Sequence, residues 1–519
     1  MKNLSEVAFK NEFVNQFPGD ESGDLTPRPT PGVLYSKALP TPVSGPTLLA
    51  WSDDLGQLLD INKPTDQRDI DVLGGNHVTS SMYPYAACYA GHQFGHWAGQ
   101  LGDGRAITLG EIIGIDGQSY ELQLKGAGPT AYSRRADGRA VLRSSVREYL
   151  MSEAMFYLGV PTTRALSLVN TGDPVLRDMF YNGNAAYEPG AIVARVSPSF
   201  LRFGNFEILA ARQEKEHLQQ LIDWTIARYY PHIQGEERVI TWYKEVVDRT
   251  ARLMVEWSRV GFVHGVMNTD NMSILGLTID YGPYSFVDDY DPNFTPNTTD
   301  LPGRRYAFGK QAAIGKWNLA CLAGAIAPVF EDTAPLSAAL ESFDDTYWVH
   351  YYGMMANKLG LDQLYEEDVI LIRQLEKSLT AIKPDMTIFF QLLIDLPEVF
   401  PSESETLQHF QESFYQQPGE NEIKDLHQWV SDYQERRSKI SISKEDSQTL
   451  MRATNPRFIL RNYLLHQAIQ ELEKGENTLF LKLQEAIKEP YTNKSDEFFA
   501  KRPEWATQQA GCSMLSCSS

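Results

Sequence analysis

The clearest candidate for chemistry is the polar stretch His264-Gly-Val-Met-Asn-Thr-Asp-Asn271, which is followed by Asp280-Tyr-Gly282. Asn271 and Asp280 flank a short hairpin-like run, and amide and carboxylate oxygens so placed can both bind one Mg²⁺ ion. Asp270 adds a second carboxylate directly beside Asn271. The alternative interpretation is a polar loop followed by a turn. Residues further upstream favour the metal site.

The same stretch follows the catalytic-loop pattern H-R-D-x-x-x-x-N and the D-F-G pattern of protein kinases. His264 matches the histidine, Asn271 the metal-binding asparagine, and Asp280 the first residue of D-F-G. Val266, however, stands where a kinase has the aspartate that orients the substrate hydroxyl, and an aliphatic side chain cannot accept a proton. Either the chain is catalytically inactive, or its base is a different carboxylate, for which Asp270 is the candidate.

Three upstream features occur in the order found in the small lobe of kinases: a glycine-rich segment at 99–105, Lys125, and Glu148. Glycines let backbone N–H groups approach phosphate oxygens, although a plain Gly-Asp-Gly hairpin turn explains this segment alone equally well. Glu148 lacks a basic residue at the neighbouring helical positions. It is therefore free to pair with Lys125.

Short strands and turns are predicted to position these residues. Residues 120–125 alternate between apolar and polar side chains, which predicts a strand whose last residue, Lys125, faces away from the core. Turn signals at Gly102-Asp-Gly104 and Asp116-Gly117 separate this strand from its neighbours. Further along, we expect a helix over 139–158, strands over 164–170 and 191–196, and mostly helices after 208, including one over 236–260.

The order of strands before helices predicts an α+β protein with a kinase-like bilobal fold. We expect an N-terminal arm and lead-in (1–60), a small lobe of sheet plus helix (61–208), and a large helical lobe that ends in a C-terminal tail (209–519). The arm is predicted because residues 17–47 are rich in Pro, Gly, Ser and Thr.

Composition excludes several classes of protein. The 519 residues carry a formal net charge of −20, which argues against binding along a nucleic-acid backbone. The N-terminus has no basic n-region, and the longest apolar run, 319–330, is too short to span a bilayer. The 4 cysteines form no disulfide framework. We therefore expect a cytoplasmic protein without nucleic-acid or membrane partners.

Several long and unusual strings carry a resemblance to a known family. They are Gly91-His-Gln-Phe-Gly95, Gly99-Gln-Leu-Gly-Asp-Gly-Arg105, Leu124-Lys-Gly-Ala-Gly128, Asp137-Gly-Arg-Ala-Val-Leu-Arg-Ser144, His264 to Asn271, and Asp280-Tyr-Gly-Pro283. In them the chain resembles the selenoprotein O family, from about residue 30 to the C-terminus. Members of that family look like pseudokinases but transfer AMP from ATP to Ser, Thr or Tyr hydroxyls of proteins. The resemblance implies a protein adenylyltransferase.

The resemblance also implies roles for individual residues, with the nucleotide flipped relative to kinases so that its α-phosphate faces the acceptor. The residues implied to line the nucleotide site are Gly102, Gly104, Arg105, Lys125, Asp137, Gly138, Glu148, Arg195, Arg202 and Asp280. Two of these, Arg195 and Arg202, would grip the flipped phosphates, for which the planar guanidinium is well suited. Asn271 and Asp280 would hold Mg²⁺ or Mn²⁺, and Asp270 would accept the hydroxyl proton. The implied partners are ATP and hydroxyl-bearing proteins, and the family leans towards monomers.

Alternatives stay open at this point. Val266 favours an inactive nucleotide-binding pseudokinase that acts as a scaffold; a phosphotransferase with Asp270 as base and UMP transfer from UTP are also compatible with the sequence. His92 and His96 lack an evident third ligand, so we expect no zinc site there. In the tail, Cys517 resembles the sulfur counterpart of the selenocysteine found in some family members. A regulatory disulfide with Cys512 is one hypothesis, and two inert thiols is the other.

Overall fold

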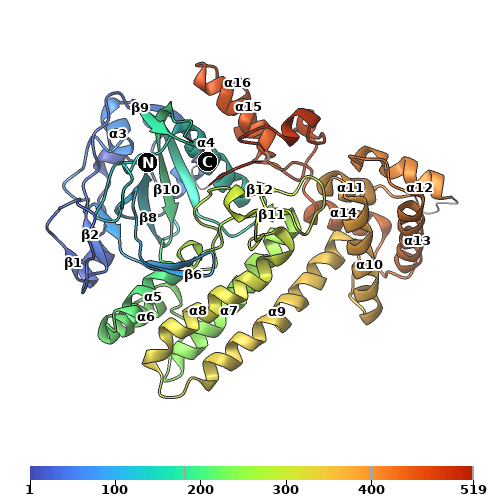
Figure 1. Cartoon of the computed structure of the whole chain (residues 1–519), viewed down its shortest axis with the longest axis horizontal. Coiled ribbons are helices and arrows are strands. Elements are labelled where there is room, and N and C mark those ends of the chain that lie inside the picture. Colours follow the sequence, from blue (N-terminus) through green and yellow to red (C-terminus); the bar gives the residue numbers. More distant parts are fainter. Residues whose placement is uncertain (180–182, 398–401, 513, 517–519) are drawn as a thin grey trace.

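The computed structural model describes residues 1–179, 183–397, 402–512 and 514–516. Strands gather in the N-terminal part of the chain and helices in the C-terminal part, as the colour change from blue to red shows in Figure 1. The predicted α+β class with an extended helical C-terminal region is confirmed. The arrangement is consistent with the predicted bilobal, kinase-like order.

An eight-stranded sheet has the strand order β1-β2-β4-β7-β8-β10-β9-β3. Its strands are β1 (Gly19–Asp20), β2 (Tyr35–Lys37), β3 (Thr47–Trp51), β4 (Tyr85–Ala87), β7 (Ala106–Ile113), β8 (Ser119–Lys125), β9 (Arg164–Arg177) and β10 (Ala186–Ser197). Two separate pairs are β5 (Ala90–Gln93) with β6 (His96–Gln100), and β11 (Phe262–Val263) with β12 (Ser285–Phe286). Neighbours in the large sheet are antiparallel except for β1 and β2.

The hairpin of β7 and β8 follows the turn signal in the sequence. Gly117 adopts a φ of 76°, a conformation that glycine reaches without steric cost. The register of the hairpin places Ala106 opposite Lys125. The turn chemistry therefore decides where Lys125 lies in the sheet.

The polar side of β8 is buried, which corrects the prediction that Lys125 points away from the core. Gln123 is fully buried and donates hydrogen bonds to Asp103 Oδ2 at 3.3 Å and to Thr108 Oγ1 at 3.1 Å. The Lys125 side chain is only 12% exposed. Alternation in the sequence could not show this, because the second face is covered by polar side chains from other segments rather than by water.

Much of the N-terminal segment is packed against the sheet. Strands β1, β2 and β3 belong to the large sheet, and Phe13, Phe17 and Trp51 lie in the main hydrophobic core. Strands as short as these leave no periodicity in the sequence, so Pro and Gly content dominated the prediction of an arm. The division into an arm, a small lobe and a large lobe stays a prediction.

Two helices that position the site end at glycines. Helix α4 (Leu142–Tyr157) packs against β9 and β10, and Gly159 follows it with a φ of 77°. Helix α7 (Arg238–Val260) ends at Gly261, which has a φ of 76°. A left-handed residue after the last turn satisfies the free carbonyl groups of a helix end, and glycine takes this conformation most easily. Both helices lie within a few residues of their predicted bounds.

The remaining helices comprise three short ones that precede β4 and a longer series that follows the large sheet in the sequence (Figure 1). They are α1 (Glu12–Gln16), α2 (Asp53–Leu58), α3 (Gln67–Leu73), α5 (Phe203–Ala211), α6 (Lys215–Tyr229), α8 (Gln311–Ile326), α9 (Ala334–Lys358), α10 (Glu366–Ile382), α11 (Met386–Ile394), α12 (Glu403–Phe410), α13 (Glu420–Arg437), α14 (Lys444–Thr454), α15 (Asn462–Glu473) and α16 (Thr478–Ala486). One segment, Phe308–Val329, is long and apolar enough to cross a membrane by length and composition alone. It contains α8, which packs against α5 and α7.

The C-terminal tail returns to the segment that follows Asp280. Leu515 N donates to the Pro296 carbonyl at 3.2 Å, and Thr298 N donates to the Leu515 carbonyl at 2.8 Å. Cys512 is a buried free thiol, and burial raises its pKa to about 12. Cys517 lies outside the described residues, so the hypothesis of a disulfide between Cys512 and Cys517 stays a prediction.

Candidate active site

Asp280 is the centre of a cluster of buried cations. It accepts hydrogen bonds from Lys125 Nζ at 3.2 Å, Arg195 Nη1 at 2.5 Å and Arg202 Nη1 at 2.6 Å. These three donors come from β8, from β10 and from the residue that precedes α5. Asp280 has a φ of 57°, which is uncommon for a non-glycine residue and is often a feature of functional sites.

Glu148 joins the same cluster from α4. Its Oε2 lies 2.7 Å from Lys125 Nζ, and its Oε1 accepts from Arg195 Nη1 at 2.9 Å. The pair of Lys125 and Glu148 that the sequence predicts is therefore present. Charges this close interact more strongly in a buried site than in water, so Glu148 fixes the position of both cations.

The neighbouring charges shift the ionisation of the cluster. Burial alone would raise the pKa of Asp280, but Arg202, Lys125 and Arg195 hold it well below its usual range. Burial lowers the pKa of Lys125, while Glu148 and Asp280 oppose that change. The three cations outnumber the two carboxylates they contact, and this excess of positive charge suits phosphate groups.

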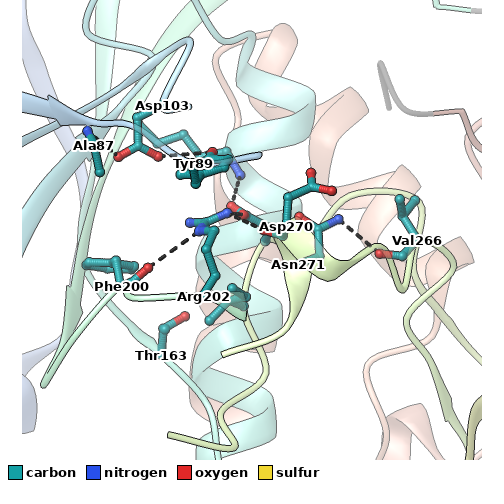
Figure 2. Close-up of polar contacts among 12 residues, drawn as sticks. Ala87, Tyr89, Asp103, Thr163, Phe200, Arg202, Val266, Asp270 and Asn271 are labelled. Carbon is teal, nitrogen blue, oxygen red and sulfur yellow. Dashed lines mark hydrogen bonds and ion pairs between the residues drawn. The ribbon is translucent and has the colours of Figure 1, made fainter. Parts of the chain in front are cut away.

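Asp270 lies beside this cluster, in the short 3-10 turn Thr269–Asn271 (Figure 2). Its main-chain oxygen accepts from Arg202 Nη1 at 2.7 Å. Its carboxylate Oδ2 accepts from Gln93 Nε2 at 3.2 Å, whereas Oδ1 is buried and has no hydrogen-bond partner in the described part of the chain. Burial raises the pKa of Asp270 to about 6. Asp270 is thus a carboxylate with spare acceptor capacity, as a general base requires.

The rest of the 264–271 loop is held by side chains that donate to main-chain carbonyls. Asn271 Nδ2 donates to the Val266 carbonyl at 2.9 Å, which leaves the amide oxygen of Asn271 as a potential metal ligand (Figure 2). His264 is buried, donates from Nε2 to the Ile279 carbonyl at 2.9 Å, and stacks on Trp257. His264 thereby ties the loop to the residue that precedes Asp280.

Known proteins share most of this sequence. The family described as protein adenylyltransferase SelO matches residues 32–488 of the chain. The chain belongs to this family. A protein nucleotidyltransferase YdiU from Cytophaga hutchinsonii is 61% identical over 519 residues, which cover 100% of both chains. Proteins of the same name from Xanthomonas campestris pv. campestris strain 8004 and Xanthomonas oryzae pv. oryzae strain PXO99A are 52% and 50% identical, covering 99% of this chain and 100% of each relative. The chain is accordingly an enzyme, a nucleotidyltransferase.

In this SelO-family chain the glycine-rich loop packs against Tyr132. A Cβ at Gly102 would lie 2.5 Å from the Tyr132 ring, and one at Gly104 would lie 2.9 Å from the Tyr132 carbonyl oxygen. Close packing therefore requires both glycines, and their contact with a nucleotide stays a prediction. Asp103 between them is buried and accepts from Tyr89 at 3.2 Å. Arg105 is near enough to Lys125 to contribute to the lowering of its pKa.

Two other predicted nucleotide contacts of the SelO-family site are engaged elsewhere. Asp137 forms an ion pair with Arg177 at 2.7 Å. A Cβ at Gly138 would lie 2.2 Å from the carbonyl carbon of Gly128, so close backbone packing requires this glycine. Across the described ranges, no hydrogen bond or ion pair joins either residue to Asp280. Their role in nucleotide binding stays a prediction.

A buried carboxylate that the sequence alone did not indicate lies beside the 264–271 loop. Glu207 on α5 accepts from His92 Nδ1 at 2.6 Å and from Thr269 Oγ1 at 2.5 Å. Cys321 lies nearby, and one possible ligand atom each from His92, Glu207 and Cys321 lies within 4.8 Å of the others. The 2.6 Å separation is that of a hydrogen bond, because two ligands on one tetrahedral zinc ion would be about 3.3 Å apart. The string at 91–95 was the one signal in the sequence that pointed here.

Proposed function

We propose that the chain transfers AMP from ATP to a Ser, Thr or Tyr hydroxyl of a protein substrate and releases pyrophosphate. The strongest support is the combination of a cationic cluster around Asp280 with a carboxylate at Asp270 rather than at position 266. The chain keeps the residues that bind and orient a nucleotide, whereas Val266 replaces the kinase base. Membership of the SelO family supports the same conclusion.

In this proposal Lys125, Arg195 and Arg202 bind the phosphate groups. Their side chains are at most 12% exposed, and charge-assisted hydrogen bonds in such a site are stronger than in water. The hydroxyl oxygen of the substrate attacks the α-phosphorus, and its proton passes to Asp270. The bond from the α-phosphorus to the bridging oxygen breaks, and pyrophosphate leaves with that electron pair. The cations stabilise the charge that develops on the phosphate oxygens.

Asn271 and Asp280 fit a divalent cation. Their amide and carboxylate oxygens are the hard ligands that Mg²⁺ and Mn²⁺ take, and the bond from Asn271 Nδ2 to Val266 leaves the amide oxygen for the ion. When bound, the ion supplies neutralisation of charge on the phosphate groups. Asp280 already has three cationic partners, so we expect metal affinity to be low until phosphates engage Arg195 and Arg202.

The remaining nucleotide contacts are assigned from the family resemblance. They are Gly102, Gly104, Arg105, Asp137 and Gly138. Among them Arg105 has the clearest physical support, because its charge already acts on Lys125. None of these contacts distinguishes an adenine from a uracil base, so ATP is proposed over UTP on the resemblance alone.

Mass spectrometry of the modified protein tests this function. The purified chain is incubated with equal ATP and UTP, with Mg²⁺ or Mn²⁺, and with itself and a mixture of cell proteins as acceptors. AMP on a hydroxyl side chain, absent with the Asp280→Asn variant, is the expected result. UMP adducts would favour UTP as the donor, and phosphate adducts would indicate a kinase with a relocated base. Nucleotide binding without any adduct would favour the scaffold.

A further inference from the structure

The β5–β6 hairpin contacts the loop that carries Asp270, residue by residue. Three hydrogen bonds join them: His92 N to Thr269 Oγ1 at 2.7 Å, Gln93 Nε2 to Asp270 Oδ2 at 3.2 Å, and Phe94 N to Asn268 Oδ1 at 3.2 Å. Consecutive residues of the hairpin thus hold consecutive residues of the loop. Nothing in the reaction as proposed uses this hairpin, although it contains the distinctive string at 91–95.

Gln93 is the hairpin side chain that reaches the base itself. Gln93 donates to Asp270 Oδ2. Among the residues that the structure describes, no other side chain donates a hydrogen bond to the Asp270 carboxylate. A hydrogen bond from an amide to one oxygen of a carboxylate restricts the rotation of that carboxylate. A base must lie within hydrogen-bond reach of the proton that it takes, so fixing this rotation matters for the rate.

Gly91 limits the carboxylate from another side. A Cβ at Gly91 would lie 2.5 Å from Asp270 Oδ1 and 2.9 Å from Asp270 Cβ. Side chains do not tolerate such contacts, so only glycine allows the hairpin to pass this close to the base. Asp270 is therefore confined between the backbone at Gly91 and the amide of Gln93.

A buried carboxylate supports both partners of this contact. Glu207 accepts from Thr269 Oγ1 in the loop and from His92 Nδ1 in the hairpin. Glu207 is 4% exposed and lies on α5, which also contacts β5 and the 3-10 turn of the loop. Hydrogen bonds to a buried, water-excluded carboxylate hold geometry tightly. The hairpin and the loop are thus anchored to the same point of the fold.

We propose that Gln93 is a positioning residue for the base, and that the β5–β6 hairpin sets the orientation of the Asp270 carboxylate towards the acceptor hydroxyl. This inference rests on the proposed function of Asp270. Gln93 acts through Asp270 and takes no proton itself. Its loss therefore lowers the rate of AMP transfer and leaves the binding of ATP at the Asp280 cluster intact.

The test compares Gln93→Leu with a matched control on the same hairpin. His96→Leu also replaces a polar hairpin side chain by leucine, but His96 is exposed on β6, across the hairpin from Gln93. For Gln93→Leu we expect kcat for AMP transfer to fall about 10- to 100-fold, with KM for ATP within about threefold of wild type. His96→Leu should stay within about threefold of wild type in both. Equal losses in the two variants would overturn the proposal, because they would indicate general damage to the hairpin.

A double-mutant cycle separates positioning of the base from any independent effect. In an Asp270→Asn background, measured by single-turnover transfer, Gln93→Leu should cause less than about a twofold further loss. The same fold loss in both backgrounds would show that Gln93 acts independently of Asp270 and would overturn the proposal. If Gln93→Leu unfolds, Gln93→Asn keeps the amide but shortens its reach, and the same loss of kcat is expected. If both Gln93 variants fold and keep the wild-type kcat while Asp270→Asn is inactive, only the positioning role of Gln93 is overturned. If Asp270→Asn keeps full activity, the proposed role of Asp270 as the base is overturned.

Discussion

The substitution Asp280→Asn should destabilise the nucleotide-free protein and increase its stabilisation by metal-free ATP. It removes one negative charge that Lys125, Arg195 and Arg202 share, and leaves Glu148 as the carboxylate that contacts two of them. The side chains of Arg195 and Arg202 are 3% and 2% exposed, so water cannot replace the lost partner. Three buried cations would then face one carboxylate.

The size of this effect follows from the burial of the cluster. Removing one partner of a buried ion pair typically costs about 3–5 kcal/mol, because the remaining charge stays desolvated. With about 2.1 cal/mol/K of unfolding entropy per residue, a chain of 519 residues shifts its unfolding midpoint by about 1 °C for each kcal/mol. We therefore expect Asp280→Asn to lower the Tm by about 3–5 °C. ATP brings the missing negative charge, and a ligand that binds the folded state raises its stability.

Thermal unfolding in the presence of a chelator, with and without ATP, measures both effects. Asp344→Asn is the control, since Asp344 pairs with Lys316 at 2.6 Å but is 59% exposed, and exposed pairs contribute at most about 1 kcal/mol. The increase in Tm with ATP should be larger in Asp280→Asn than in wild type or in Asp344→Asn. If Asp280→Asn has the same Tm as wild type and the same increase in Tm with ATP, the reasoning that Asp280 neutralises the phosphate-binding cations is refuted.

Three further predictions concern the pH dependence of stability, the arginine at the site and the close backbone packing at Gly138. Glu111 and Glu121 face each other on β7 and β8, and burial raises their pKa values to about 7 and about 8, from 4.5 in the unfolded chain. Between about pH 5 and pH 8 the folded state holds protons that the unfolded state has lost, so stability falls as pH rises. Glu121→Gln removes this ionisable group, and it should therefore raise the Tm at pH 8 and not at pH 5. An equal change in Tm at both pH values would contradict this prediction. Arg202→Lys cannot reproduce the fixed fork of the guanidinium, and it should lower kcat for AMP transfer by roughly tenfold or more without unfolding the protein; unchanged kinetics would exclude Arg202 from the site. Gly138→Ala should cost more than about 2 kcal/mol of stability, because Gly138 has a φ of 71° and a Cβ would lie 2.2 Å from the carbonyl carbon of Gly128. A Tm equal to that of wild type would contradict this prediction.

Local signals in the sequence were sufficient for several elements of the site. The absence of a basic partner for Glu148 on its own helix predicted its pairing with Lys125, which is present at 2.7 Å. The glycine after each helix predicted where α4 and α7 end. At the helix ends the deciding interaction lies within a few residues of the glycine, so a single sequence contains it. For the pair, the signal was the lack of a local partner for Glu148 together with the order of a strand lysine before a helix glutamate.

Contacts between distant segments could not be predicted in this way. The polar face of β8 is buried because Asp103, Thr108 and Arg195 cover Gln123, and alternation along one strand does not reveal its neighbours. The glycine-rich loop shows the same limit. Its glycines predicted contact with phosphate, but the structure also requires them for packing against Tyr132.

The hairpin at Gln93 and the buried Glu207 show this limit most clearly. Their partners Asp270 and Thr269 lie far along the chain, and no local pattern links the two segments. Only the unusual string at 91–95 marked the hairpin as a feature of interest. Its contact with residues 268–270 became visible only when the fold brought the two segments together.

The central claim is that the α-phosphate of ATP, and not the γ-phosphate, is transferred to protein. Purified chain is incubated with a divalent metal and ATP labelled at either position, and the label that becomes bound to protein is measured beside the Asp280→Asn and Asp270→Asn variants. The account predicts label from the α-phosphate alone, absent with Asp280→Asn and strongly reduced with Asp270→Asn. Label from the γ-phosphate, or undiminished α-label in Asp270→Asn, would contradict it.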